Sequence, residues 1–247
     1  MDVIDERDYE KTQYAIYNSP FRTDGGYPKW PEEVPYWAGG QDGAEDFYAS
    51  LKAAWMVNSD YHYRSLVAQH GGPEEWAVLA NDENVIVRAA VAMAGDVTVQ
   101  RKLCRDPSKF VREYVARNTQ PEVLREMAET EQNEDVLKAI AKRKDIPSQR
   151  TIVSKHWDNP NLLCGICPVL PHTEKEKLLA HPDPKVRVTV GAYGSRRQAA
   201  IVLLDETITN EASKFFVEQR FQELSEIAKA LVPSRHRERH LESSLER

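Results

Sequence analysis

A unit of 24 residues recurs along this chain and constrains its fold more than any other feature. The stretch Leu79-Ala-Asn-Asp-Glu-Asn-Val-Ile-Val-Arg88-Ala-Ala-Val-Ala92 aligns without a gap with Leu103-Cys-Arg-Asp-Pro-Ser-Lys-Phe-Val-Arg112-Glu-Tyr-Val-Ala116. Related blocks precede and follow these two, with slips of one residue, so that about six units lie between residues 55 and 195. A unit of this length cannot bury an apolar face by itself, and neighbouring copies must stack to complete a common core.

Each unit carries the pattern of one amphipathic helix. Val87, Val91 and Ala94 are spaced along one helical face, and Asp82 is placed to cap a turn ahead of that helix. The link to the next unit has room for only one or two further turns. We therefore expect an all-α fold in which Val87, Val111 and the later equivalent Val186 are buried.

The pattern resembles the leucine-rich repeat variant family, whose units read roughly L-A-x-D-P-x-x-x-V-R-x-x-V-A-x-N-x-x-T-P. Residues 118–128, NTQPEVLREMA, are similar to this consensus across a unit junction. The resemblance covers residues 55–197 and implies a right-handed α-solenoid of HEAT-like units with alternating α- and 3₁₀-helices. Some members of the family hold an iron–sulfur cluster on N-terminal cysteines. The first cysteine here is Cys104, so we expect no cofactor.

The chain divides by composition into four segments. Residues 1–48 are rich in aromatic side chains, proline and glycine, which breaks helices and strands and predicts an irregular N-terminal cap. The repeat solenoid is expected over 49–197 and a helical C-terminal cap over 198–232, followed by a tail at 233–247. In the C-terminal cap, Phe215, Phe221, Leu224, Ala228 and Leu231 fall mainly on one helical stripe, so we expect this closing helix to turn a polar face outward.

Charge and cysteine content bear on the compartment and the partner. The net charge of −6 equals that of residues 1–45 alone, which hold ten acidic and four basic residues. This balance disfavours a general affinity for nucleic acid. The absence of a long apolar run predicts no membrane partner. An acidic N-terminus and three cysteines predict a cytoplasmic protein.

One arginine recurs at a single position of the unit, as Arg64, Arg88, Arg112 and Arg187. Stacked copies of this side chain could bind phosphates. Alternatively, each arginine bonds the aspartate six residues earlier, Asp82 or Asp106, or the loop carbonyls of a neighbouring unit. We favour this structural ladder, because the aspartate recurs together with the arginine.

Two further groups are candidates for binding a partner. Basic side chains gather at Lys138, Lys142, Arg143, Lys144 and Arg150, where a solvated helix end is the alternative interpretation. The aromatic residues Tyr27, Trp30 and Trp37 could enter a pocket of a partner or could cover the open end of the first repeat. Of these two roles for the aromatic residues, we favour the cap.

The motif Cys164-Gly-Ile-Cys167 is flanked by His156 and His172, which is a ligand set that zinc accepts. A redox dithiol is a second possibility for the two cysteines. However, Ile166 aligns with core positions of the repeat, and small cysteines are common in helix packing. We therefore predict no metal site.

The sequence contains none of the common hydrolase, zinc-protease or nucleotide-binding motifs. We predict a non-enzymatic protein-binding scaffold and, more narrowly, an inhibitor or immunity-type binder of a basic protein. The alternative is a nucleic-acid-binding solenoid or a DNA glycosylase built from HEAT-like repeats, using the basic cluster on a concave face; for a glycosylase, Trp157 and the adjacent Asp158 are the aromatic residue and carboxylate considered.

Overall fold

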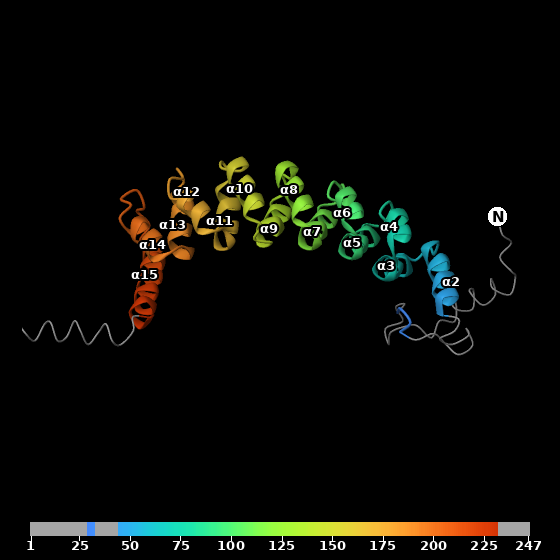
Figure 1. The fold of residues 1–247 in the computed structure, drawn as a ribbon. Helices are drawn as coiled ribbons and strands as arrows, with labels where there is room; N and C mark the ends of the chain where they lie inside the picture. Colours follow the sequence, from blue (N-terminus) through green and yellow to red (C-terminus); the bar gives the residue numbers. More distant parts are fainter. Residues whose placement is uncertain (1–28, 33–43, 232–247) are drawn as a thin grey trace, which may run out of the picture. The chain divides into compact units, whose positions relative to one another are not determined.

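The computed structural model describes residues 29–32 and 44–231, and the regular elements within these ranges are all helices (Figure 1). The chain divides into two units, residues 1–139 and 140–247, which are considered separately. The predicted all-α solenoid is confirmed, because consecutive helices pack against one another in repeating pairs. None of the helices in 44–231 combines the length and the apolar character needed to cross a bilayer.

The first unit stacks helices in two layers (Figure 1). Helices α3, α5 and α7 lie side by side in one layer, and α4, α6 and α8 form the other. The unit contains α2 (Ala44–Met56), α3 (Tyr61–His70), α4 (Pro73–Leu79), α5 (Val85–Ala94), α6 (Val97–Leu103), α7 (Lys109–Asn118), α8 (Pro121–Thr130) and most of α9 (Glu134–Lys142).

Capping residues and prolines determine where the helices of the first unit begin and end. Asn84 caps α5 by accepting a hydrogen bond from the N–H of Ile86, and Asp96 caps α6 in the same way. Helix α5 ends at Gly95, whose N–H donates to the Val91 carbonyl. Helices α4 and α8 begin with proline, which needs no hydrogen-bond acceptor at that position.

The repeated apolar residues form the core, as the spacing predicts. Val87 and Val111 are completely buried, and Val186 is equally buried at the equivalent position of the second unit. Trp55, at the core leucine position of the first repeat, is also completely buried. The spacing of these residues is sufficient to predict their burial, because every 24-residue repeat contacts the next repeat through the same helical face.

The second helix of each repeat differs from the expectation that came with the family resemblance. It is a short α-helix rather than a 3₁₀-helix, as α4 and α6 show. The N–H of Ala80 donates to the carbonyl of Trp76, and the N–H of Cys104 to that of Gln100, which are four-residue spacings. A helix of seven residues, such as α4 or α6, is long enough to form these α-helical hydrogen bonds.

The second unit continues the paired arrangement. It contains α10 (Ile146–Lys155), α11 (Pro160–Ile166), a 3₁₀ turn η3 (Cys167–Val169), α12 (His172–Leu178), α13 (Pro184–Tyr193), α14 (Arg196–Leu203) and α15 (Glu211–Leu231). Helices α10 and α12 lie in one layer, and α11 and α13 in the other (Figure 1). The last helices close on a core that includes Ala199, Val202, Ile208 and Val217.

Helix α15 exposes the polar side chains that the sequence led us to expect, Glu218, Gln219, Gln222 and Glu223 among them, but two phenylalanines are exposed beside them. Val217 is the completely buried residue of this helix, and it packs with Val202 of α14. Phe215, assigned to the buried stripe from its spacing, is 57% exposed, and its neighbour Phe216 is 67% exposed. Val217 and Phe221 lie on the side of α15 that packs on the core, and Phe215 lies about half a turn away from that side.

Candidate functional site

Four arginines at one repeat position each bind two neighbouring repeats. Arg88 donates from Nε to Oδ2 of Asp106 at 2.7 Å and from Nη2 to Oδ1 at 3.1 Å. Its Nη1 donates to the backbone carbonyls of Asp82 and Glu83 at 2.8 and 3.1 Å. The carboxylate belongs to the following repeat, whereas the carbonyls belong to the loop ahead of α5. We call this set the arginine ladder; its pairs are Arg64–Asp82, Arg88–Asp106, Arg112–Glu131 and Arg187–Asp205.

Arg88 and Arg112 do bond the aspartate six residues earlier, but through its backbone carbonyl and not through its carboxylate. Asp82 gives its backbone carbonyl to Arg88, but its carboxylate accepts from Arg64 in the preceding repeat. The loop that holds Asp82 therefore lies between two arginines. In this geometry, each rung of the ladder joins one repeat to the next.

The ladder leaves little of its charge available for a ligand. The side chains of Arg88 and Asp106 are 14% and 4% exposed. A bidentate arginine–carboxylate pair of this kind recovers much of the free energy lost when the charges leave water. The arrangement holds repeats together and gives no support to phosphate binding.

Each carboxylate of the first unit's ladder also accepts a hydrogen bond from the backbone two residues later. Asp82 accepts from Asn84, Asp106 from Ser108, and Glu131 from Asn133. Burial alone would raise the pKa of Glu131, but the hydrogen bonds from Arg112 and from the backbone outweigh it and leave that pKa below its usual value. The glutamate therefore stays ionised in the folded chain.

At one position of the arginine ladder in the second unit, neither the arginine nor the carboxylate is present. Leu163 occupies the arginine position, and His181 occupies the carboxylate position 18 residues later. The N–H of Asp183 approaches Nδ1 of His181 at 3.0 Å, and a backbone N–H can only donate. Nδ1 is therefore the acceptor, and Nε2 carries the proton that is donated to the Trp157 carbonyl at 2.8 Å.

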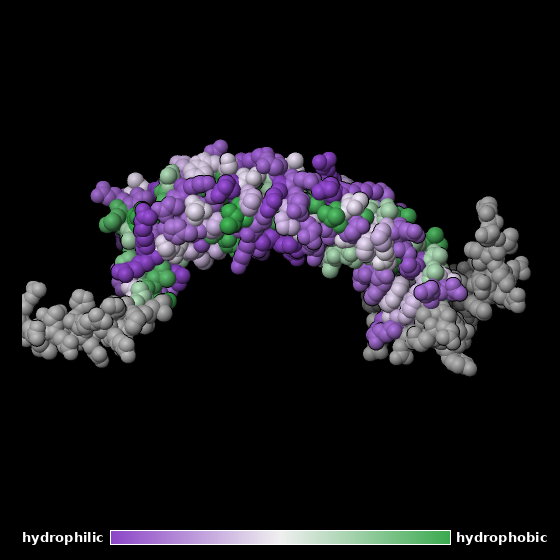
Figure 2. Space-filling view, in the orientation of Figure 1, coloured by the Kyte–Doolittle hydropathy of each residue, from purple (hydrophilic) through white to green (hydrophobic). Residues whose placement is uncertain are grey.

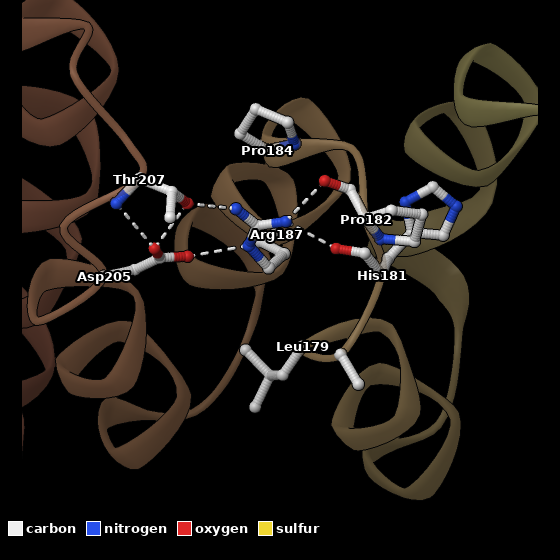
Figure 3. A pocket seen from close by; sticks show the side chains of 8 residues that line it. Leu179, His181, Pro182, Pro184, Arg187, Asp205 and Thr207 are labelled. Carbon is white, nitrogen blue, oxygen red and sulfur yellow. Dashed lines mark hydrogen bonds and ion pairs between the residues drawn. The ribbon is translucent and has the colours of Figure 1, made fainter.

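A shallow hollow of about 450 Å³ lies at the last rung of the ladder, beside the loop before α13 (Figure 3). The guanidinium of Arg187 lies between the carbonyls of His181 and Pro182 on one side and Asp205 with Thr207 on the other. These groups bond one another across the hollow. The polar lining therefore has a structural role, as in the rungs of the first unit.

Trp30, one of the three aromatic binding candidates, packs within the chain. Its ring stacks on His70 with centroids 4.6 Å apart and on Tyr48 at 5.8 Å, and it meets Trp55 edge-on. The Tyr48 hydroxyl donates to the carbonyl of Pro31 at 3.2 Å. Residues 29–32 thus lie against α2 and α3, as a cap would. Tyr27 and Trp37 lie outside the described residues.

The contact with Trp30 should be measurable through His70. Burial lowers the pKa of His70 below its usual value of 6.5. Because the unfolded chain then binds more protons, the free energy of unfolding should fall as the pH is lowered through 6.5. Replacing Trp30 by alanine should uncover the imidazole and return its pKa toward 6.5, as followed by NMR titration. The exposed neighbour Lys29→Ala provides the control, and an unchanged pKa in Trp30→Ala would contradict the stack.

The basic cluster is partly neutralised. Lys138 pairs with Glu134 one turn earlier on α9 at 3.3 Å, and Arg150 on α10 pairs with the buried Glu174 at 3.2 Å. The remaining members, Lys142, Arg143 and Lys144, are exposed at the end of α9 and in the loop that follows. The cluster matches the solvated helix end that the sequence allowed.

The two cysteines and two histidines are not brought together as metal ligands. Within residues 29–32 and 44–231, no three side chains of His, Cys, Asp or Glu are placed to hold a metal ion. Cys167 is completely buried, which raises the pKa of its thiol to about 12 and opposes the thiolate that zinc requires. Cys164 is half-buried and accepts a hydrogen bond from Thr189 at 3.3 Å. His156 follows α10, whereas His172 is exposed at the start of α12.

Trp157, considered for stacking on a flipped base, is occupied within the second unit. Its ring lies 4.8 Å from that of His181, and its carbonyl accepts the hydrogen bond from the same histidine. Asp158 is exposed beside it. This arrangement explains Trp157 as packing around the altered rung.

Sequence reasoning missed an exposed apolar surface on two adjacent helices of the first unit. Four large side chains are exposed on the layer formed by α3, α5 and α7: Ile86 and Met93 on α5, and Phe110 and Tyr114 on α7. Phe110 is 59% exposed and Met93 is 53% exposed. We call these four residues the α5–α7 face. Ile86 and Phe110 occupy the same repeat position, which is the signal that could have identified it. Figure 2 shows apolar residues interrupting a largely hydrophilic surface.

Cations flank the aromatic rings of the α5–α7 face. The ammonium of Lys109 lies 5.5 Å from the centre of the Phe110 ring, and the guanidinium of Arg117 lies 6.0 Å from that of Tyr114. Lys109 also pairs with Asp135 at 2.8 Å, and Arg117 pairs with Glu113. An apolar centre surrounded by paired charges is typical of protein-binding surfaces.

Comparison with known proteins gives the fold and no activity. No protein-family model matches the chain, and no curated protein matches it. A solved structure described as a leucine-rich repeat variant with a novel repetitive structural motif is similar, with a TM-score of 0.56 and 22% sequence identity. The match covers 87% of this chain and 82% of that one. The chain therefore has the leucine-rich repeat variant fold, as its repeats predicted.

Proposed function

We propose that this chain is a non-enzymatic scaffold that binds another protein through the α5–α7 face. The observation that supports this proposal is the exposure of large apolar side chains on two adjacent helices whose opposite sides are completely buried. Val87 and Val111 fix α5 and α7 in the core, so the exposed rings are held on a firm base. Binding to a preformed surface costs little conformational entropy, and aromatic residues dominate binding energies.

Paired surface variants test the use of this face. The variant Ile86→Ser/Phe110→Ser removes two apolar side chains, and Val78→Ser/Val97→Ser removes two exposed ones from α4 and α6 in the other layer. Proteins captured by each chain from native lysate would be quantified by mass spectrometry, with circular dichroism as a check on folding. A partner should bind the wild type and the Val78/Val97 variant, and its recovery should fall about tenfold or more with Ile86→Ser/Phe110→Ser.

The outcomes of this experiment are distinct. Loss of one partner with the α5–α7 variant alone supports the proposal. Recovery of the same proteins by all three chains would contradict it, and so would the absence of any specific partner of the wild type. Equal loss in both variants would assign binding to general surface hydrophobicity instead.

We further propose that the partner is basic, as it would be for an inhibitor or immunity protein acting in the cytoplasm. The support is the net charge of −6 in residues 1–45 and the free state of all three cysteines. Because Trp30 packs against α2 and α3, deletion of the whole segment would also remove a cap. Neutralising Asp5, Glu6, Asp8 and Glu10 as amides is the cleaner change. Affinity for the captured partner should fall and vary less with salt; an unchanged salt dependence would contradict a basic partner.

A further inference from the structure

Large apolar side chains are exposed among the polar residues of α15, in the part of the chain where a solenoid normally exposes polar residues alone. Phe215 and Phe216 contact each other as a T-shaped pair with ring centres 6.3 Å apart, and Ile227 three turns later is 52% exposed. The opposite side of the helix packs on α13 and α14 through Val217. Closing helices require a polar outer side for solubility, so this exposure calls for a partner.

A hollow of about 600 Å³ adjoins Phe215. Leu203, Ala212 and Phe215 supply apolar lining, while Glu211, Lys214 and Glu218 supply charged groups. Glu211, Phe215 and Glu218 follow one another at spacings of four and three residues, which places them on one face of the helix. An aromatic ring therefore lies between two carboxylates, one turn from each.

The exposed charge has a single sign over the part of α15 whose side chains the structure describes. Over residues 211–228, every charged side chain that is exposed is a glutamate: Glu211, Glu218, Glu223 and Glu226. The two cations in the same range, Lys214 and Arg220, are half-buried, and Arg220 pairs with Glu223 at 3.3 Å. The surface thus joins apolar rings to a local negative potential, which attracts cations.

We propose that the α15 outer face, defined as Phe215 and Phe216 with Glu211 and Glu218, docks a basic amphipathic segment of a partner protein. Apolar side chains of that segment cover the two rings, and its lysines or arginines pair with the two glutamates. The aliphatic stems of these cations can also lie along the phenylalanine rings. This surface is separate from the α5–α7 face and does not depend on it.

Charge decides among the possible occupants. Nucleic acid and acidic peptides would be repelled by the exposed glutamates. A second copy of this helix, placed face to face, would bring the same glutamates against one another. A basic protein segment meets both the apolar and the acidic parts of the surface without such repulsion.

Model peptides test the proposal on the full chain. The probe is a fluorescein-labelled helical peptide of 15 residues in which leucines form one face and lysines the other, and its counterpart carries glutamate in place of lysine. Fluorescence anisotropy at low and moderate salt should show binding of the lysine peptide alone. Glu211→Lys/Glu218→Lys should weaken that binding about tenfold, because two attractions become repulsions. The charge-matched control Glu74→Lys/Glu122→Lys, on α4 and α8, should leave it unchanged.

An apolar pair of variants separates this surface from the α5–α7 face. Phe216→Ser should weaken binding of the lysine peptide, whereas Phe110→Ser should not. Equal affinity in the wild type and in the Glu211/Glu218 variant, or equal binding of the glutamate peptide, would overturn the proposal. A failure of the α5–α7 face in its own capture experiment would leave this result unaffected.

Two further measurements test the rival occupants. Arg235→Glu/Arg237→Glu/Arg239→Glu alters the segment that follows α15 in the full chain; tighter peptide binding by this variant would show that this segment competes for the face and would overturn the assignment to a partner. Sedimentation of the wild type as a monomer supports the proposal. A dimer that Phe216→Ser dissociates would assign the face to self-association instead.

Discussion

Replacing Arg88 by alanine is expected to lower the free energy of unfolding by about 3–5 kcal/mol. The change leaves the Asp106 carboxylate, only 4% exposed, without its cation. It also removes the donor from the Asp82 and Glu83 carbonyls. Both losses fall at the junction of two repeats, where the ladder joins them. Urea unfolding followed by far-ultraviolet circular dichroism measures the effect.

Arg101→Ala is the matched control for this prediction. Arg101 pairs with Glu126 at 3.1 Å, but both side chains are largely exposed, so its loss should cost less than about 1 kcal/mol. Arg88→Leu/Asp106→Asn should cost less than Arg88→Leu alone, because no charge is then left unpaired in the interior. Leu163 and His181 show that the fold accepts such an exchange of both partners. Equal losses for Arg88→Ala and Arg101→Ala would contradict a stabilising ladder.

The second large effect is expected at Gly191, where α13 passes close to α14 and α15. A methyl group added at this position would lie 2.8 Å from Cγ1 of Val217 and 3.1 Å from Val202. Both valines are buried and cannot turn away freely. Gly191→Ala should therefore lower the free energy of unfolding by about 1–3 kcal/mol through overpacking. Chemical unfolding of the full chain, with the change in heat capacity as a check on the extent of unfolding, measures it.

Gly165→Ala provides a control of opposite sign. Gly165 is exposed within α11, so alanine there should raise the free energy of unfolding by up to about 1 kcal/mol through its higher helix propensity. Stabilisation by both substitutions would show that α13 is not in the close contact described above. Destabilisation by Gly191→Ala alone agrees with it.

The repeat pattern was sufficient to predict the helices and the core. A valine recurs at one position of the repeat, as Val87, Val111 and Val186. Each of these valines is buried because each repeat makes the same contact as the repeat before it. The arginines of the ladder were identified by the same periodicity. Their carboxylate partners were not identified, since spacing within one repeat does not show that a loop side chain turns toward the preceding repeat.

Hydrophobicity alone did not reveal the exposed surfaces. Phe110 on the α5–α7 face and Phe215 on α15 are as apolar as many core residues, and Phe215 was assigned to the buried stripe although it lies about half a turn from Leu224 around the helix. Trp30 shows the reverse case, because an aromatic residue considered for binding a partner stacks between Tyr48 and His70. Burial of such a side chain depends on what packs against its helix, and residues distant in the sequence supply that packing.

The amino-acid sequence by itself determined that this protein is a stack of short helical repeats with a shared valine core, because stacking identical faces is the one arrangement that buries them all. Only the tertiary structure decided that the arginine ladder links successive repeats and that α15 turns two phenylalanines outward. The physical reason is that these features depend on the rotation of each helix against its neighbours. Contacts between repeats set that rotation, and a periodic pattern leaves it undetermined.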